Sequence, residues 1–214
     1  MADWSTISSL ATGAGTLVLA VATFASVRSA NRSARVAEAA LQEQRRPVLV
    51  HSRLDDPDQK IMFVDGHWVH AGGGGAVAED FDGTVYLAMS LRNVGAGIGV
   101  LQGWSIRRGR LLTADLHTGA ENFRTLSRDL YIPAGDIGLW QGALRDDADG
   151  LHGEIAEAVA EREPLTVELL YSDQVGGQRT ISRFTLTPVA DSRWITAVGR
   201  HWYLDQAGPR SDLV

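Results

Sequence analysis

The chain has 214 residues, with 20 basic side chains, 26 acidic side chains and no cysteine. This length suits one ordinary domain with an appendage. The absence of cysteine excludes a disulfide framework, a cysteine-based zinc site and a cysteine nucleophile. The formal net charge of −6 argues against a general nucleic-acid binder, because such proteins carry a basic surface. We therefore expect no nucleic-acid partner.

An uncharged, mostly apolar segment extends from Trp4 to Val27. About 20 apolar residues cross the hydrocarbon core of a bilayer, so the segment is long enough for a transmembrane helix. A cleaved signal peptide is one alternative, but it requires positive charge before its apolar core, and no basic residue precedes Trp4. A long soluble helix packed on a partner is the other alternative. The charge pattern favours a retained membrane helix.

The arginines that flank this segment predict its orientation. None precedes it, and five follow it, namely Arg28, Arg32, Arg35, Arg45 and Arg46. Basic residues stay on the cytoplasmic side of a membrane span. We expect a single-pass protein of the bacterial inner (plasma) membrane, with the N-terminus outside and the C-terminal domain in the cytoplasm.

The helix is predicted to continue beyond the membrane. Ser29–Arg46 contains no proline or glycine and is rich in good helix formers. Pro47 then ends the segment. The predicted organisation is a transmembrane helix with a cytoplasmic stalk over residues 1–46, followed by a second domain over residues 47–214.

Small residues recur along one side of this helix at alternating steps of four and three. That spacing is the seam of packed helices, and small residues let helix backbones approach closely in a membrane. The seam predicts docking of another transmembrane helix or of a second copy. Its members are Ser9, Gly13, Thr16, Ala20, Thr23, Val27, Ala30, Ala34, Ala37 and Leu41.

Residues 47–214 show eight or nine short apolar segments separated by glycine-containing turns. In Thr84–Leu91 every second residue is apolar, as in a half-buried strand. Glu154–Arg162 predicts one short helix, with Ile155, Ala158 and Val159 on its inner face. Ala71–Gly83 contains four consecutive glycines and predicts a mobile loop. The fold class expected is mainly β, an antiparallel β-sandwich preceded by the long helix.

One turn motif carries a resemblance to a known group. Arg92-Asn93-Val94-Gly95-Ala96-Gly97, after an apolar helix, an Ala/Arg stalk and Arg46-Pro47, resembles uncharacterised actinobacterial single-pass membrane proteins with a small β-sandwich. Ile98-Gly99 departs from the Pro-Ala usual in that group. The resemblance covers roughly half of the chain and implies an accessory subunit of a membrane transport complex such as a lipid importer. The residues themselves predict a turn that redirects a strand.

No pattern in the chain predicts catalysis or a cofactor. His67 and His70 are three apart on an expected strand, so they point to opposite faces and do not pinch one metal ion. Asp55, Asp56 and Asp58 crowd one loop but lack the spacing of a calcium site, so we expect solvated acids. The common nucleophile, zinc and nucleotide motifs are missing. We expect a protein that is not an enzyme and binds no cofactor or metal.

Five tryptophans follow the stalk, and most fit a core with aromatic residues at its rim. A run near the C-terminus is the first choice for a protein-interface patch, because Trp, Tyr and Arg dominate binding hot spots. Its members are Arg200, His201, Trp202 and Tyr203.

These features together predict a non-enzymatic accessory subunit that docks on a larger integral membrane complex, for instance a lipid transporter. Two alternatives stay open. The chain could form a homo-oligomeric membrane scaffold or sensor through the same helix seam. Its sandwich could instead bind a small molecule that enters near Gly72–Gly75.

Overall fold

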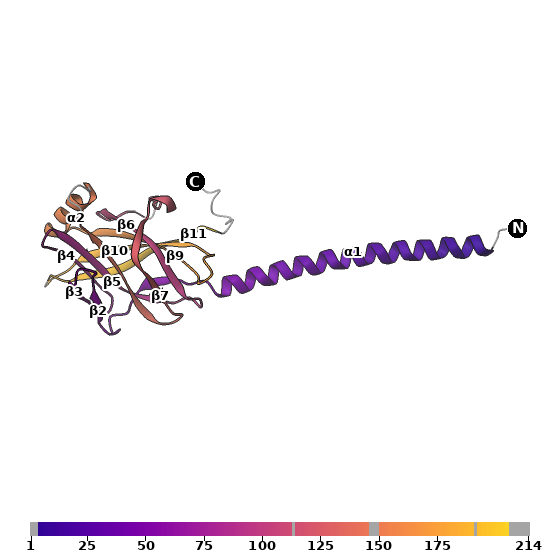
Figure 1. The fold of residues 1–214 in the computed structure, drawn as a ribbon, viewed down its shortest axis with the longest axis horizontal. Helices are drawn as coiled ribbons and strands as arrows, with labels where there is room; N and C mark the ends of the chain where they lie inside the picture. The colour runs from indigo at the N-terminus through magenta and orange to yellow at the C-terminus, as the bar shows by residue number, and fades with distance from the viewer. Residues whose placement is uncertain (1–3, 113, 146–149, 191, 206–214) are drawn as a thin grey trace. The chain divides into compact units, whose positions relative to one another are not determined.

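The computed structural model describes residues 4–112, 114–145, 150–190 and 192–205, with side chains from Gly13 onward except that of Ser127. The chain divides into two compact units, one ending at Gln44 and one beginning at Arg45. The first unit is a single helix, α1 (Trp4–Gln44) (Figure 1). It ends before Pro47, as the sequence predicts, because proline cannot continue a helix.

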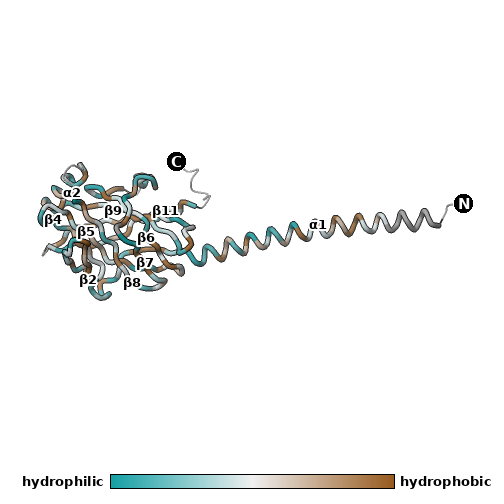
Figure 2. Tube along the Cα trace, viewed as in Figure 1, coloured by the Kyte–Doolittle hydropathy of each residue, from teal (hydrophilic) through white to brown (hydrophobic). Residues whose placement is uncertain are grey.

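Helix α1 has the composition expected of a membrane-crossing segment. Gly13–Gln44 is long and apolar enough to cross a membrane, and it lies near the N-terminus, where membrane anchors and signal sequences both occur. Every described side chain of α1 is exposed. Apolar residues in the middle of the helix give way to more polar ones toward its C-terminal end (Figure 2).

The second unit is mainly β and antiparallel, which confirms the predicted fold class. Nine of its described strands form one sheet that curls into a half-barrel. The two packed layers expected of a sandwich are therefore opposite parts of one continuous curled sheet. Two further strands form a separate hairpin. The strands are β1 (Leu49–His51), β2 (Gln59–Met62), β3 (Trp68–Ala71), β4 (Gly75–Phe81), β5 (Thr84–Asn93), β6 (Gly99–Arg108), β7 (Arg124–Ile132), β8 (Ile137–Leu144), β9 (Leu165–Ser172), β10 (Thr180–Pro188) and β11 (Trp194–Tyr203).

The strand order in the half-barrel is β1-β5-β4-β11-β10-β9-β6-β7, and β8 pairs with the other side of β5. Strands β7 and β8 lie close together without sharing a ladder. Alternate side chains from these strands point inward and form one core, in which Trp140, Tyr171 and Phe184 are fully buried. The hairpin β2–β3 packs on the outside of the sheet through a second cluster that includes Ile61 and Tyr86.

Helix α2 (Gly150–Ala160) confirms the predicted short helix and its inner face. Ile155 and Ala158 are fully buried in the half-barrel core, and Val159 packs against its edge. A 3₁₀ turn, η1 (Ala120–Asn122), precedes β7.

The mobile loop predicted for Ala71–Gly83 is wrong. Strand β4 occupies most of it and pairs with β5 through a two-residue turn at Asp82-Gly83, where φ is positive at both positions. The glycines serve close packing, because a Cβ at Gly73 would collide with the carbonyl oxygens of Arg53 and Asp56. Ala76 and Ala78 are small enough to pack β4 against the core, and small side chains give a weak strand signal.

The Arg-Asn-x-Gly-x-Gly motif clasps the start of the second unit. Asn93 is fully buried; its Oδ1 accepts from the N–H groups of Val48 and Gly95, and its Nδ2 donates to the carbonyls of Gly97 and Ile132. The glycines allow the turn to lie against the backbone of residues 45–48, since a Cβ at either one would collide with it. The predicted strand-redirecting turn therefore also holds the segment that precedes β1.

Candidate functional site

The predicted helix seam lies entirely within α1. Its nine members from Gly13 to Leu41 are exposed, and the side chain of Ser9 lies outside the described residues. The hydroxyl of Thr23 donates to the carbonyl of Leu19 at 2.8 Å, so this polar group is satisfied within its own helix. Such an internal bond suits a helix that lies in lipid.

The predicted interface patch alternates between the two sides of β11. Two guanidinium groups lie over the Trp202 ring, with that of Arg183 4.8 Å and that of Arg200 5.1 Å from the ring centroid. The imidazole of His117 meets the same ring edge-on at 5.3 Å. Trp202 is thus half-buried among cationic groups and is not a freely exposed anchor.

His201 and Tyr203 point to the opposite side from Trp202. His201 Nδ1 lies 2.6 Å from Ser182 Oγ, which in turn lies 2.8 Å from the hydroxyl of Tyr171. Burial lowers the pKa of His201 and raises that of Tyr171 to about 12. Ser182 has no exposed surface, so this Ser–His pair offers no nucleophile to a substrate. The ring of Tyr203 lies under the guanidinium of Arg46, 4.4 Å from its centroid.

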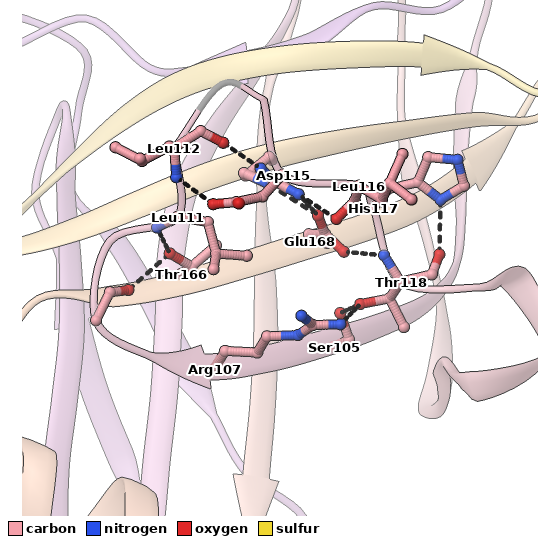
Figure 3. A network of polar contacts seen from close by, with 12 residues as sticks. Ser105, Arg107, Leu111, Leu112, Asp115, Leu116, His117, Thr118, Thr166 and Glu168 are labelled. Carbon is pink, nitrogen blue, oxygen red and sulfur yellow. Dashed lines mark hydrogen bonds and ion pairs between the residues drawn. The ribbon is translucent and has the colours of Figure 1, made fainter. Parts of the chain in front are cut away.

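The loop that carries His117 lies across the outer face of the sheet, and we call its described residues, 109–112 and 114–119, the strap (Figure 3). Thr118 fixes one end, because its N–H donates to Glu168 Oε2 at 2.7 Å and its hydroxyl lies 3.0 Å from Ser105 Oγ. Thr166 fixes the other end by donating to the carbonyl of Gly109 at 2.7 Å. The strap exposes large apolar side chains at Leu112 and Leu116.

A buried ion pair underlies the strap. Arg183 and Glu168 are 3% and 2% exposed and lie 2.8 Å apart. Arg183 also donates to the carbonyls of Leu112 and Leu116, at 3.0 and 2.8 Å. Burial alone would raise the pKa of Glu168, but the hydrogen bonds from Thr118 and the partner Arg183 outweigh it and lower this pKa. The pair therefore stays charged and ties the strap to β9 and β10.

Acidic and histidine side chains elsewhere bind neighbouring protein groups. Within the described ranges no three His, Asp or Glu side chains gather to hold a metal ion. His67 stacks on Tyr86 with centroids 4.1 Å apart and lies 2.6 Å from Glu79 Oε1. Asp56, predicted to be solvated, is instead held by the guanidinium of Arg92, whose hydrogen bond is the main cause that lowers the pKa of Asp56.

No family model, curated protein or solved structure matches this chain. The resemblance to actinobacterial single-pass proteins therefore stays an expectation carried by its turn motif.

A groove of about 980 Å³ lies beside β4. Its two walls are the hairpin strand β3, with Trp68 and His70, and the end of α2, with Val159 and Arg162 just beyond it. Strand β11 closes one end through Trp194 and Ile195, among other lining residues. Sequence patterns missed this groove, since its walls come from four separate segments.

The glycine loop expected to admit a small molecule borders this groove. Gly72, Gly73 and Gly75 all line it. Two amides of the loop are used internally, because Gly74 N donates to Ser52 Oγ and Gly75 N donates to Gly72 O, both at 2.9 Å. These two amides therefore do not cradle an anion, and the loop acts as a packed wall.

Proposed function

We propose that this chain is a single-pass membrane subunit that acts by binding and not by catalysis. Helix α1 anchors it in the bacterial inner membrane, and the half-barrel domain recognises a larger integral membrane complex such as a transporter. The domain lies in the cytoplasm in this proposal, because all five flanking arginines follow the apolar segment.

The observation that carries the proposal is the exposed apolar surface of α1. Leu17, Leu19 and Phe24 are 67%, 68% and 70% exposed. Removing such side chains from water contributes roughly 1.5–3 kcal/mol each, so the helix gains a large free energy from lipid or from a partner. Membrane insertion provides that environment, and a retained anchor keeps the domain beside other membrane proteins.

The small-residue seam supports a helix partner within the membrane. Lipid covers apolar side chains as well as a protein does, so close backbone packing is what favours association there. The half-barrel domain supports recognition outside the membrane, because the strap exposes Leu112 and Leu116 beside Trp202 and the groove beside β4 is open.

The proposal is tested by pull-down of the tagged full chain in mild detergent, followed by mass spectrometry. A stoichiometric multi-pass partner is expected, and Gly13→Leu combined with Ala20→Leu should abolish its capture. The matched control is Gly15→Leu combined with Ala22→Leu, which adds the same bulk about 120° or more around the helix from the seam.

Three results would contradict parts of this proposal. Capture of only further copies of the chain would favour the homo-oligomeric scaffold. A complex that survives both seam substitutions would exclude the helix seam and leave docking to the domain. A chain that stays soluble after cell lysis without detergent would exclude the membrane anchor.

A further inference from the structure

Strand β4 has one edge that is only partly paired. Its hairpin register with β5 places the N–H and C=O groups of Ala76, Ala78 and Asp80 on the side away from β5. On that side Ala76 pairs with Trp194 of β11, and the pairing between β4 and β11 does not extend past Ala76 toward Asp80. The chain before Trp194 turns away, with a positive φ at Ser192. The backbone groups of Ala78 and Asp80 therefore have no strand opposite them in the described part of the chain.

This unpaired edge lies in the groove defined above, and Ala78 is among the lining residues. On one face of β4, Ala78 packs in the same core cluster as α2, and Val159 lines that wall. On the other face, Val77 packs against the hairpin cluster, and the half-exposed Trp68 lines that wall. An added strand would thus place alternate side chains against Val159 and against Trp68.

The charges at the two ends of the groove indicate a direction for that strand. Of the charged residues that line it, Glu79 lies at one end, and Arg162 and Arg193 lie toward the other, where Asp58 lies beside Gly72. Arg162 donates to the neutral carbonyls of Val189 and Arg193, so its positive charge stays available. A strand antiparallel to β4, the more stable pairing, begins at the acidic end and finishes at the arginines.

A second copy of the domain does not fit this edge. Each β4 edge lies between its own hairpin and its own α2, so two such edges do not reach one another. Symmetric pairing that uses both Ala78 and Asp80 would also bring Glu79 opposite its own copy, and like charges directly opposite are destabilising. A narrow extended segment is the occupant that fits.

We infer that the groove beside β4 binds an extended peptide segment of a partner protein by strand addition. The segment carries a basic residue at its N-terminal end, three apolar residues, and an acidic residue at its C-terminal end. Main-chain bonds to Ala78 and Asp80 supply affinity, and the pockets at Val159 and Trp68 supply selectivity. This inference rests on the proposed function, since it names the partner surface that the anchored domain recognises.

The test uses the full chain in detergent and the labelled peptide acetyl-Lys-Thr-Val-Val-Val-Asp-amide, followed by fluorescence anisotropy. Its third and fifth residues lie opposite Asp80 and Ala78, so methylating those two peptide nitrogens should weaken binding at least about tenfold. Methylating the fourth nitrogen, which points away from β4, should change binding less than about twofold. No binding, or equal effects of the two methylation patterns, would overturn strand addition.

A charge swap tests the direction. Arg162→Glu should weaken the peptide that ends in Asp by about fivefold or more and should favour a peptide with the Lys and Asp exchanged. Arg110→Glu is the matched control, because Arg110 is exposed and lies outside the lining of the groove. A preference unchanged by Arg162→Glu would overturn the assigned direction.

The peptide test is independent of the helix seam. A chain with Gly13→Leu and Ala20→Leu should bind the peptide as the unmodified chain does. Failure of the unmodified chain to capture a multi-pass partner, with peptide binding intact, would therefore count against the proposed membrane complex only. Absence of peptide binding by an unmodified chain that still captures the partner would count against the groove only.

Discussion

Asn93 shows how one residue joins distant parts of the domain. Its side-chain amide donates twice and accepts twice, and all four partners are backbone groups from residues 48, 95, 97 and 132. An amide alone provides both donors and acceptors in this compact form. The motif suggested a local turn, but the bonds to Val48 and Ile132 extend it across three strands.

Asn93→Asp should destabilise the domain by about 2–4 kcal/mol. The substitution keeps the shape and the two accepted bonds, but it leaves the carbonyls of Gly97 and Ile132 without donors and buries a charge. Urea unfolding followed by tryptophan fluorescence measures the effect. The control is Asn122→Asp. Because Asn122 is exposed, this substitution should change the free energy of unfolding by less than about 0.5 kcal/mol. Equal effects at the two positions would contradict this role for Asn93.

His201 gives the stability of the domain a dependence on pH. Burial lowers its pKa in the folded state below the ordinary 6.5, so the unfolded chain binds the proton more readily. The stability that neutral His201 provides is fully present above pH 6.5 and is lost as the pH falls through its lower folded value.

His201→Asn should remove this part of the pH dependence, because an asparagine keeps a polar group near Ser182 but does not titrate. Unfolding curves between pH 7.5 and pH 5 measure it. The exposed His70→Asn variant controls for the loss of one imidazole. An acid loss of stability equal to that of the unmodified chain would show that His201 is not its source.

At the scale of elements, the strap depends on one buried ion pair. Removing one partner of such a pair leaves an uncompensated buried charge, which costs about 3–5 kcal/mol. Glu168→Gln removes the carboxylate that accepts from Thr118, and Arg183→Met removes the donor to Leu112 and Leu116.

Either substitution should destabilise the domain by about 3–5 kcal/mol and increase proteolysis and hydrogen exchange within the strap. The control is Arg179→Met, which breaks an exposed pair with Asp205 and should cost less than about 1 kcal/mol. Hydrogen exchange in the strap that is unchanged by Arg183→Met would contradict this role for the ion pair. The double variant should be less destabilised than the sum of the two, since neither charge is then left alone.

Elements with a strong apolar period were predictable from the sequence. Strand β5 and the inner face of α2 follow from the spacing of their apolar residues, and helix α1 follows from its uncharged apolar segment and the good helix formers after it. Strand β4 was not, because Ala76 and Ala78 pack as well as larger residues there but give little apolar signal. The groove and the strap could not be predicted from the sequence either, because they form where separate segments of the chain come together in the folded sheet.

At the scale of the whole molecule, the chain couples an exposed apolar helix to a domain with its own core. Each unit is compact without the other. The second unit begins at Arg45, and the turn at Asn93 lies against the backbone of residues 45–48 within that unit. The orientation of the helix then decides which compartment contains the groove and its partner.

The absence of cysteine makes the orientation of the helix easy to measure with a single introduced thiol. Val175 is 81% exposed in the turn between β9 and β10, so Val175→Cys introduces one reactive thiol. Positive charge after the apolar segment predicts that this turn lies in the cytoplasm. A membrane-impermeant maleimide should therefore label the variant only after the cells are permeabilised, while a periplasmic control protein is labelled in intact cells. Labelling of Val175→Cys in intact cells would reverse the topology and place the β4 groove outside the cytoplasm.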